Sequence, residues 1–249
     1  ARRQQEFAQR EKAFLQEAHR QICADGLLSL HMAKVARACD YATGTLYQHF
    51  SSKEDLLLAL STELIETRLS YFRRAAAWRA ESRARQFALS VADMLFAREY
   101  PEHFKLAQYV GTQVVWGAAC AERHEAMFAC CRPITDLVCG IVDDAIAAGD
   151  LEPHGRRNIE LTLGPWTMTL GMHTLVHSDG LLEQYDLKDP YRLMLRQLHL
   201  LLNGMLWKPF VNAYDDAVLT ASIERVFSEV FPEIKTGNEF FDNDLAGIF

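Results

Sequence analysis

One stretch near the N-terminus decides the fold. It reads Val35-Ala36-Arg37-Ala38-Cys39-Asp40-Tyr41-Ala42-Thr43-Gly44-Thr45-Leu46-Tyr47-Gln48-His49-Phe50-Ser51-Ser52-Lys53-Glu54-Asp55-Leu56. Apolar residues at helical spacing lie on both sides of a break at residues 39–41, which predicts two short helices, the second over about 43–49. A long helix is predicted directly after them, over about 52–78. Two short helices separated by a few residues form a helix-turn-helix.

The flanking sequence defines the helices on either side of this stretch. An upstream apolar stripe ends at Gly26, a residue type that commonly terminates helices. The stripe consists of Phe7, Phe14, Leu15, Ala18, Ile22 and Cys23. Downstream, Ser51 and Glu54 have the spacing of a capping box at the start of the long helix, and Ser52 with Asp55 is the alternative pair.

The rest of the chain is predicted to be helical as well. Apolar residues recur every three or four positions and strand-like alternation is nearly absent. The longest segment, about 123–149, contains Pro133 and is either one kinked helix or two helices. Residues 236–249 form a polar tail with few aromatic residues, which we expect to be poorly ordered.

Charge is distributed unevenly along the chain. Residues 1–53 contain eight basic and five acidic residues, a net charge of +3, whereas the 249 residues together carry −7, which leaves −10 for the remainder. A basic surface is attracted to phosphates, so we expect contact with a nucleic acid at the N-terminal end. Arg2 and Arg3 either reach a minor groove or belong to a solvated terminus.

Several other classes of protein find no support in the sequence. It has no apolar run of membrane-spanning length and no signal-peptide pattern, so we expect a cytoplasmic protein. The six cysteines lack zinc-site spacing, and of His103, His173 and His177 only the last two form a helix pair, so we predict no metal and no cofactor. Hydrolase, phosphate-loop and dinucleotide motifs are absent, so we predict no catalytic residue and no enzyme.

The helix-turn-helix stretch resembles a known family. Over about residues 10–60 it is similar to the DNA-binding signature of the tetracycline-repressor (TetR) family, most specifically in 44–50 and 52–56. The resemblance implies an all-α protein with an N-terminal three-helix helix-turn-helix domain and a larger helical domain for ligand binding and dimerisation. We expect the DNA-binding domain at 1–55, the helical domain at 56–235 and a flexible tail at 236–249.

Seven residues are candidates for DNA contact. They are Thr43, Gly44, Thr45, Tyr47, Gln48, His49 and Lys53. A helix in the major groove can present hydroxyl, amide and imidazole groups to phosphates or base edges, and Gly44 lets the backbone approach a phosphate closely. The contact between Lys53 and a phosphate is implied by the resemblance. A solvated surface position is the alternative for each polar residue, above all for Gln48 and His49.

Three positions depart from the family pattern. Asp40 stands where the family has a turn glycine, and Asp tolerates a left-handed conformation less freely. Ala42 stands where a hydroxyl residue usually caps the recognition helix, which makes Thr43 the candidate cap. His31 replaces the usual Thr or Ser cap of the preceding helix. These departures affect the contacts expected with DNA and leave the predicted fold intact.

The C-terminal part contains candidate ligand-binding residues with aromatic or flexible apolar side chains and a few polar tips. They are Phe104, Tyr109, Trp116, Phe128, Trp166, Met168, Met172 and His173, each with a place in the core as its alternative. Their chemistry favours a lipophilic effector such as an acyl chain or an aromatic compound.

Two late helices, about 156–177 and 190–207, are apolar nearly all round and need cover on two sides. A second subunit is the simplest cover for one side, and Gly164 and Gly171 would allow close helix approach there; a monomeric buried core is the alternative.

These observations predict a ligand-responsive transcriptional regulator, most simply a repressor. It would bind a near-palindromic operator as a homodimer and be released by a small lipophilic effector. A constitutive DNA-binding protein without an effector, and an enzyme-like body with a DNA-targeting head, are the alternatives.

Overall fold

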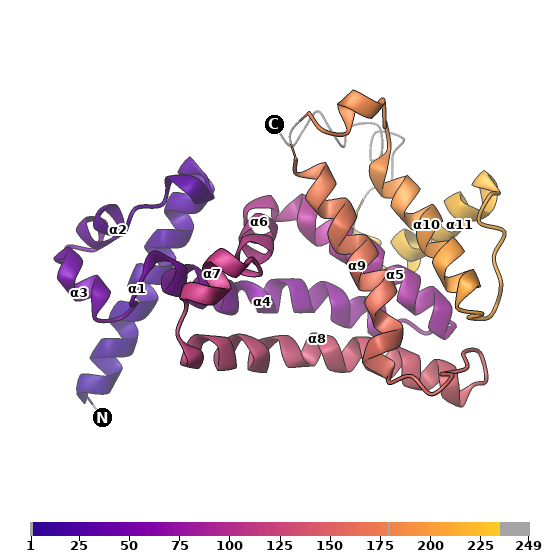
Figure 1. Cartoon of the computed structure of the whole chain (residues 1–249), viewed down its shortest axis with the longest axis horizontal. Coiled ribbons are helices and arrows are strands. Elements are labelled where there is room, and N and C mark those ends of the chain that lie inside the picture. Colours follow the sequence, from indigo (N-terminus) through magenta and orange to yellow (C-terminus); the bar gives the residue numbers. More distant parts are fainter. Residues whose placement is uncertain (1, 179, 235–249) are drawn as a thin grey trace. The chain divides into compact units, whose positions relative to one another are not determined.

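The chain is helical throughout the part that the structure describes (Figure 1). The computed structural model describes residues 2–178 and 180–234. Within these ranges there is no strand, so the all-α expectation is confirmed. The α-helices are α1 (Arg2–Asp25), α2 (Met32–Ala38), α3 (Thr43–Tyr47), α4 (Lys53–Ala77), α5 (Ser82–Glu99), α6 (Pro101–Val110), α7 (Gln113–Ala118), α8 (Ala121–Ala147), α9 (Asn158–Val176), α10 (Pro190–Gly204) and α11 (Asp216–Val230). Two short 3-10 helices, η1 (Leu27–Ser29) and η2 (Glu183–Tyr185), lie between them.

The observed helices match the sequence periodicity closely. The apolar segments predicted over 156–177 and 190–207 correspond to α9 and α10. Helix α8 continues through Pro133, so the single-helix alternative is the observed one. The predicted tail at 236–249 lies outside the described residues. None of the helices in the described part of the chain combines the length and apolar content needed to cross a bilayer.

The described residues form two compact units. The first contains the residues up to Glu66 together with Tyr100–Cys131, and the second contains Thr67–Glu99 together with the described residues from Arg132 onward. Helices α4 and α8 each contribute residues to both units. The functional boundary expected after residue 55 does not coincide with an edge of either compact unit and remains a prediction.

The first unit has one hydrophobic core to which both of its segments contribute. Phe14, Val35, Leu46 and Phe50 from the N-terminal segment are completely buried. The second segment adds Leu106, Val110, Val115 and Met127 to the same cluster. Complete burial of one such side chain stabilises a fold by about 1.5–3 kcal/mol, so the two segments depend on each other for stability.

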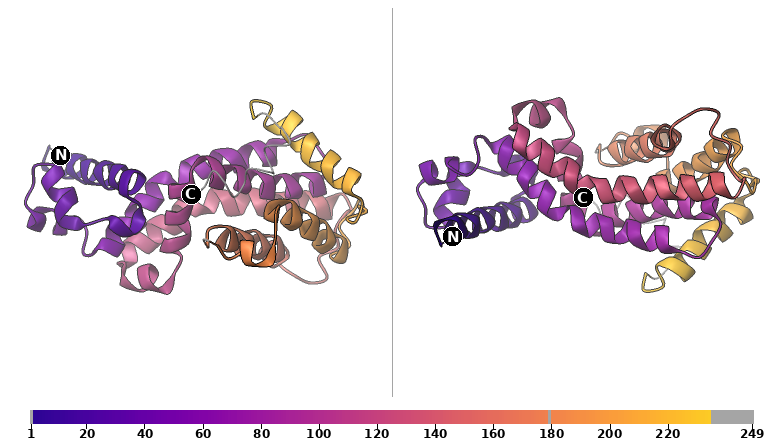
Figure 2. Two further views of the ribbon diagram at one scale, coloured as in Figure 1. Left: turned by 90° about the horizontal axis from the view of Figure 1, so that it is seen from above. Right: turned by 90° about the horizontal axis from the view of Figure 1, so that it is seen from below.

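The second unit is built around α5, which is buried along almost its whole length. Helices α9, α10 and α11 all contact it, and in Figure 2 α9 and α10 lie on one side of α5 and α11 on the other. Arg83 of α5 is buried and donates hydrogen bonds to the backbone oxygen atoms of Trp207 and His199 and to Oδ1 of Asn203. These bonds offset part of the cost of burying the charged group.

Candidate nucleic-acid interface

A tight turn joins α2 to α3. Helix α2 ends at Ala38 with Cys39 as its C-cap, and Asp40 has a φ of 60°, in the left-handed region. The backbone N–H of Tyr41 then bonds to the oxygen of Ala36 at 3.0 Å and closes the turn. The position that holds glycine in the resembling family therefore has a left-handed conformation here too, and Asp is among the few other residues that accept it.

Helix α3 exposes one face and buries the other. Leu46 and Phe50 are fully buried in the core of the first unit and fix the orientation of the helix. Thr43 and Thr45 are partly exposed, and Gly44, Tyr47 and Gln48 are exposed, Tyr47 by half of its surface. The residue before α3 is Ala42, and no side chain caps the helix, so Thr43 does not take over the capping role.

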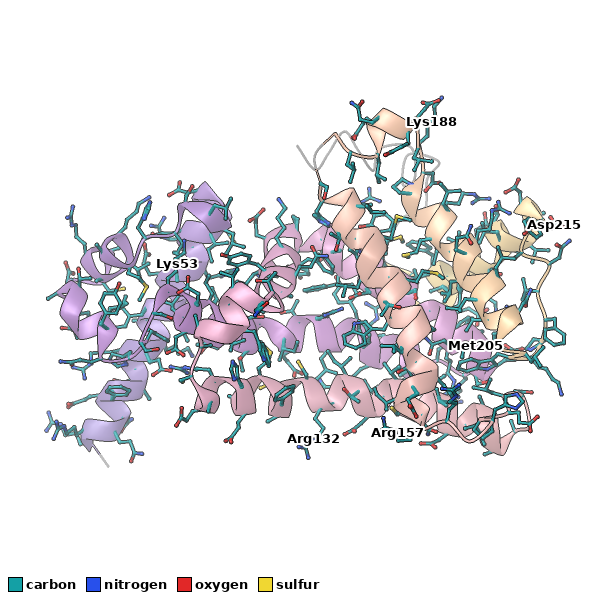
Figure 3. All side chains as sticks on the ribbon, viewed as in Figure 1. Lys53, Arg132, Arg157, Lys188, Met205 and Asp215 are labelled. Atoms are coloured by element: carbon teal, nitrogen blue, oxygen red, sulfur yellow. The ribbon has the colours of Figure 1, made fainter. Side chains whose placement is uncertain are left out.

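Lys53, labelled in Figure 3, is the first residue of α4, the helix that follows α3 in the chain. The start of α4 is capped by the second of the two alternative pairs, because Ser52 Oγ accepts the N–H of Asp55 at 3.0 Å. The carboxylate of Asp55 in turn accepts the N–H of Ser51 at 3.1 Å. A cap of this kind typically contributes about 1 kcal/mol and fixes where the helix starts, and with it the position of Lys53.

His49 differs from the other six candidates. Its side chain is fully buried, stacked on the ring of Phe7 with the ring centroids 3.8 Å apart, and Nδ1 lies 3.5 Å from Glu11. Burial lowers the pKa of His49, which favours the neutral ring. The expectation that His49 contacts DNA is therefore not supported, because α1 covers the imidazole. The sequence carried no local signal for this contact, which joins residues 42 positions apart.

Arg123 of α8 is a positioning residue that the sequence analysis missed. Its guanidinium lies 3.0 Å from Glu11 of α1 and 3.8 Å from Asp55 of α4. It also donates a 3.2 Å hydrogen bond to the backbone oxygen of His49 and lies over the ring of Phe50. One side chain thus contacts α1, the first turn of α4 and the residues that directly follow α3.

The first four ligand candidates belong to the first unit. Phe104 is buried, and Tyr109 and Trp116 are partly buried against the hydrophobic core. Phe128 is exposed and meets the ring of Trp116 edge-on, with 5.4 Å between centroids. The structure therefore brings Trp116 and Phe128 together and places Phe104 in the interior.

The other four candidates lie on α9 in the second unit. Trp166 is exposed, Met168 and Met172 are half-buried, and His173 is completely buried. His173 is the one of these with a polar environment, described next.

A buried network of charged and polar groups surrounds His173. Arg68 forms two hydrogen bonds with Asp93, at 2.8 and 2.9 Å. Nε2 of His173 lies 3.5 Å from the same carboxylate, and Nδ1 lies 2.9 Å from the hydroxyl of Tyr191. Burial alone would raise the pKa of Asp93, but Arg68 and His173 outweigh it and hold that pKa well below its usual range. The network is a polar centre in a mainly apolar helical unit, and only His173 was identified from sequence.

The second unit also has an open groove of about 490 Å³. It is lined by Arg73, Ala76, Arg85, Pro133, Asp136, Leu137, Gly140, Ile141 and Asp144. None of the eight ligand candidates borders it.

Comparisons with known proteins agree with this geometry. Residues 14–60 match the family model described as bacterial regulatory proteins, tetR family. No curated protein matches the chain.

Several solved structures share the fold. A protein with unknown function from Rhodococcus sp. RHA1 is 23% identical with a TM-score of 0.58, covering 79% of this chain and 95% of that one. A bacterial regulatory protein in the tetR family from Rhodococcus RHA1 is 18% identical with a TM-score of 0.57, covering 80% and 98%. The transcriptional regulator FadR from Bacillus subtilis, in complex with stearoyl-CoA, is 18% identical with a TM-score of 0.54, covering 78% and 98%.

Regulators of the tetR family are DNA-binding proteins and not enzymes. The matched segment contains the helix-turn-helix, including the exposed face of α3. Residues 14–60 therefore match the DNA-binding segment of the tetR family of bacterial regulatory proteins, and the chain shares its fold with a solved regulator of that family.

Proposed function

We propose that this regulator is a repressor that binds a near-palindromic operator as a homodimer and is released by a small lipophilic effector. The observation that carries the DNA-binding part is the exposed face of α3, defined as Thr43, Gly44, Thr45, Tyr47 and Gln48. Its backbone is fixed by buried Leu46 and Phe50, and Lys53 supplies a cation at the start of the next helix. A rigid polar helix face beside a cation suits base-edge and phosphate contacts in a major groove.

A dimer is supported by an unpartnered stripe on α9. The stripe consists of Ile159, Leu163, Trp166 and Leu170, which are between 40% and 56% exposed. Their spacing of four, three and four places them on one helix face. Exposed apolar stripes of this kind mark interaction surfaces, and a second copy of the same stripe buries both by two-fold symmetry.

The two glycines of α9 have different surroundings. A Cβ at Gly164 would lie 3.2 Å from Leu201 of α10, so Gly164 serves packing within the chain. Gly171 is exposed and faces open space, so it alone remains available to a partner subunit.

The effector proposal concerns the four candidates on α9. The Bacillus subtilis regulator with a similar fold binds stearoyl-CoA, a ligand with a long apolar chain and a polar head. Met168 and Met172 offer apolar surface of the kind an acyl chain requires, whereas Trp166 lies on the stripe proposed for the dimer. His173 of the same helix is buried beside Asp93 and Tyr191. The 490 Å³ groove does not include the four candidates, and we propose that side chains or helices move when the effector binds.

Such a movement supplies the regulatory link. An effector that binds the rearranged form better than the DNA-binding form shifts the population away from DNA. DNA and effector then weaken each other's binding by the same factor.

Two glycine-to-alanine substitutions, one on the proposed DNA-binding face and one away from it, test this face. Gly44→Ala adds a methyl group that would meet no atom within 4 Å, so the fold tolerates it, yet the methyl obstructs close approach by a phosphate. Gly117→Ala is the matched control, since it also lies on a short helix and faces open space. We expect Gly44→Ala to weaken binding to the protein's own upstream DNA about 10-fold, or about 1.4 kcal/mol, with Gly117→Ala unchanged, measured by fluorescence anisotropy. Equal affinities for the two variants would refute the assigned face.

The effector part is tested separately by native mass spectrometry. A dimer should bind the upstream DNA, and stearoyl-CoA or another acyl-CoA should release it while two ligands are retained. DNA binding that no acyl compound alters would favour the constitutive alternative. A monomer without DNA affinity at low salt would overturn the repressor proposal as a whole.

A further inference from the structure

Three metal-ligating side chains converge in the first unit. His19 and Cys23 lie on α1, four residues apart, and His103 lies on α6. Nε2 of His19 is 2.6 Å from Nε2 of His103 and 3.4 Å from Sγ of Cys23. The three atoms all lie within 4.8 Å of one another, and no other group of three or more such residues occurs in the described ranges.

The spacing on α1 explains part of this geometry. Residues four apart lie on the same face of a helix, so His19 and Cys23 present their side chains together. His103 lies 84 residues after His19 in the sequence, and its ring stacks on Tyr100 with 5.3 Å between centroids. Nδ1 of His103 is buried without a hydrogen-bond partner, so the ring interacts through Nε2.

Two of the three ligand separations are within about 0.7 Å of tetrahedral values, and the third, between His103 and Cys23, is within 4.8 Å. With zinc–nitrogen and zinc–sulfur bonds of about 2.0 and 2.3 Å, tetrahedral geometry separates two nitrogen ligands by about 3.3 Å and a nitrogen from a sulfur by about 3.5 Å. The observed 3.4 Å between His19 and Cys23 is already close to that value. The 2.6 Å between the two histidines must open by about 0.7 Å, within reach of partly exposed side chains.

We propose that His19, Cys23 and His103 form a binding site for a thiolate-preferring divalent ion, of which Zn²⁺ fits best. Two imidazoles and one thiolate are borderline-to-soft ligands, which disfavours Mg²⁺, Ca²⁺ and Mn²⁺. Three protein ligands leave a fourth position for water or for the carboxylate of Glu102, the residue before His103.

The ion would connect α1 to α6 directly. In the described structure, a hydrogen bond joins the ring of His19 on α1 to the ring of His103 on α6. A metal replaces it with bonds to three side chains and restrains the helix that carries Phe7 and Glu11, the neighbours of His49. Occupancy would thus stabilise the first unit, independently of any effector in the second.

Co²⁺ titration of the full, tag-free, reduced chain tests the site, because a thiolate ligand gives Co²⁺ a charge-transfer band and tetrahedral geometry intensifies its visible bands. We expect one Co²⁺ per chain, displaced by one Zn²⁺. Cys23 is exposed, so Cys23→Ser should fold normally yet lose the charge-transfer band and bind Zn²⁺ at least 10-fold more weakly. His103→Phe keeps an aromatic ring against Tyr100 and should lose affinity similarly.

Cys39→Ser and His31→Ala are the controls, since both lie in the same unit away from the cluster. They should leave the band and the affinity unchanged. Hydrogen exchange should slow in α1 and α6 when Zn²⁺ is added to the unsubstituted chain, and not in Cys23→Ser. Absence of a thiolate band, or a band that survives Cys23→Ser, would overturn the proposal. Because these measurements involve no DNA, they are independent of the repressor proposal.

Discussion

Acid should destabilise the second unit through His199 of α10. The imidazole is buried, stacked on Phe87 with 4.4 Å between centroids, and the guanidinium of Arg83 is close by. Neither ring nitrogen has a hydrogen-bond partner among the described residues. Burial, and after it the positive charge of Arg83, lowers the pKa of His199 from 6.5 to about 4.

The sign and size of the effect follow from linkage. In the unfolded chain the imidazole binds a proton below about pH 6.5, whereas in the folded chain it resists protonation until about pH 4. Falling pH therefore favours the unfolded state. Between about pH 7 and about pH 4.5 the free energy of unfolding should fall by about 2.5 kcal/mol from this residue alone.

Urea unfolding of the unsubstituted chain and of His199→Phe, at both pH values, isolates this contribution. Phenylalanine can keep the stack on Phe87 and cannot titrate. The free energy of unfolding of His199→Phe should therefore fall by about 2.5 kcal/mol less than that of the unsubstituted chain over the same pH range. Other groups keep titrating in both proteins, among them His49 and His103, whose pKa values burial also lowers. If the free energy of unfolding falls by the same amount in both proteins, and their m-values are equal, the reasoning is refuted.

Three further predictions concern other parts of the structure. Asp40→Val should lower the free energy of unfolding in urea by about 1–2 kcal/mol, because a β-branched residue resists the φ of 60°. Asp40→Gly should leave it unchanged, and equal losses in the two variants would contradict this. Asp93→Asn should cost about 3 kcal/mol, because it removes the buried negative charge that pairs with Arg68 and His173. Thermal unfolding measures the loss, and a loss below about 1 kcal/mol would argue against the network. Trp166→Glu should convert a dimer to a monomer, measured by light scattering. Tyr214→Glu, at a position that is also exposed but lies outside α9, should not. A dimer of Trp166→Glu would exclude the apolar stripe of α9 as the interface.

Local features of the fold were predictable from the sequence. The break before Thr43, the start of α4 near Lys53 and the apolar segment of α10 each follow from periodicity and capping within a few residues. Asp40 was identified as the turn residue through the family resemblance, because it stands where the family has a glycine, and its φ of 60° is in the left-handed region.

Contacts between distant segments were not predictable. Phe7 covers His49, and Arg123 joins Glu11 to Asp55, through packing that no local pattern encodes. The pairing of His19 with Cys23 had a visible signal, their spacing of four, but the third ligand lies 84 residues away on another helix. Ligand candidates chosen by side-chain chemistry alone fell into both compact units.

The discontinuous first unit has a consequence for the newly made protein. Translation proceeds at about 5–20 residues per second, so residues 67–131 take roughly 3–13 s to synthesise after Glu66. Until then the emerging chain lacks Arg123 and the four apolar side chains that complete the core. A nascent chain still attached to its ribosome would therefore have an incomplete DNA-binding unit, and DNA binding would begin only with molecules translated through α8.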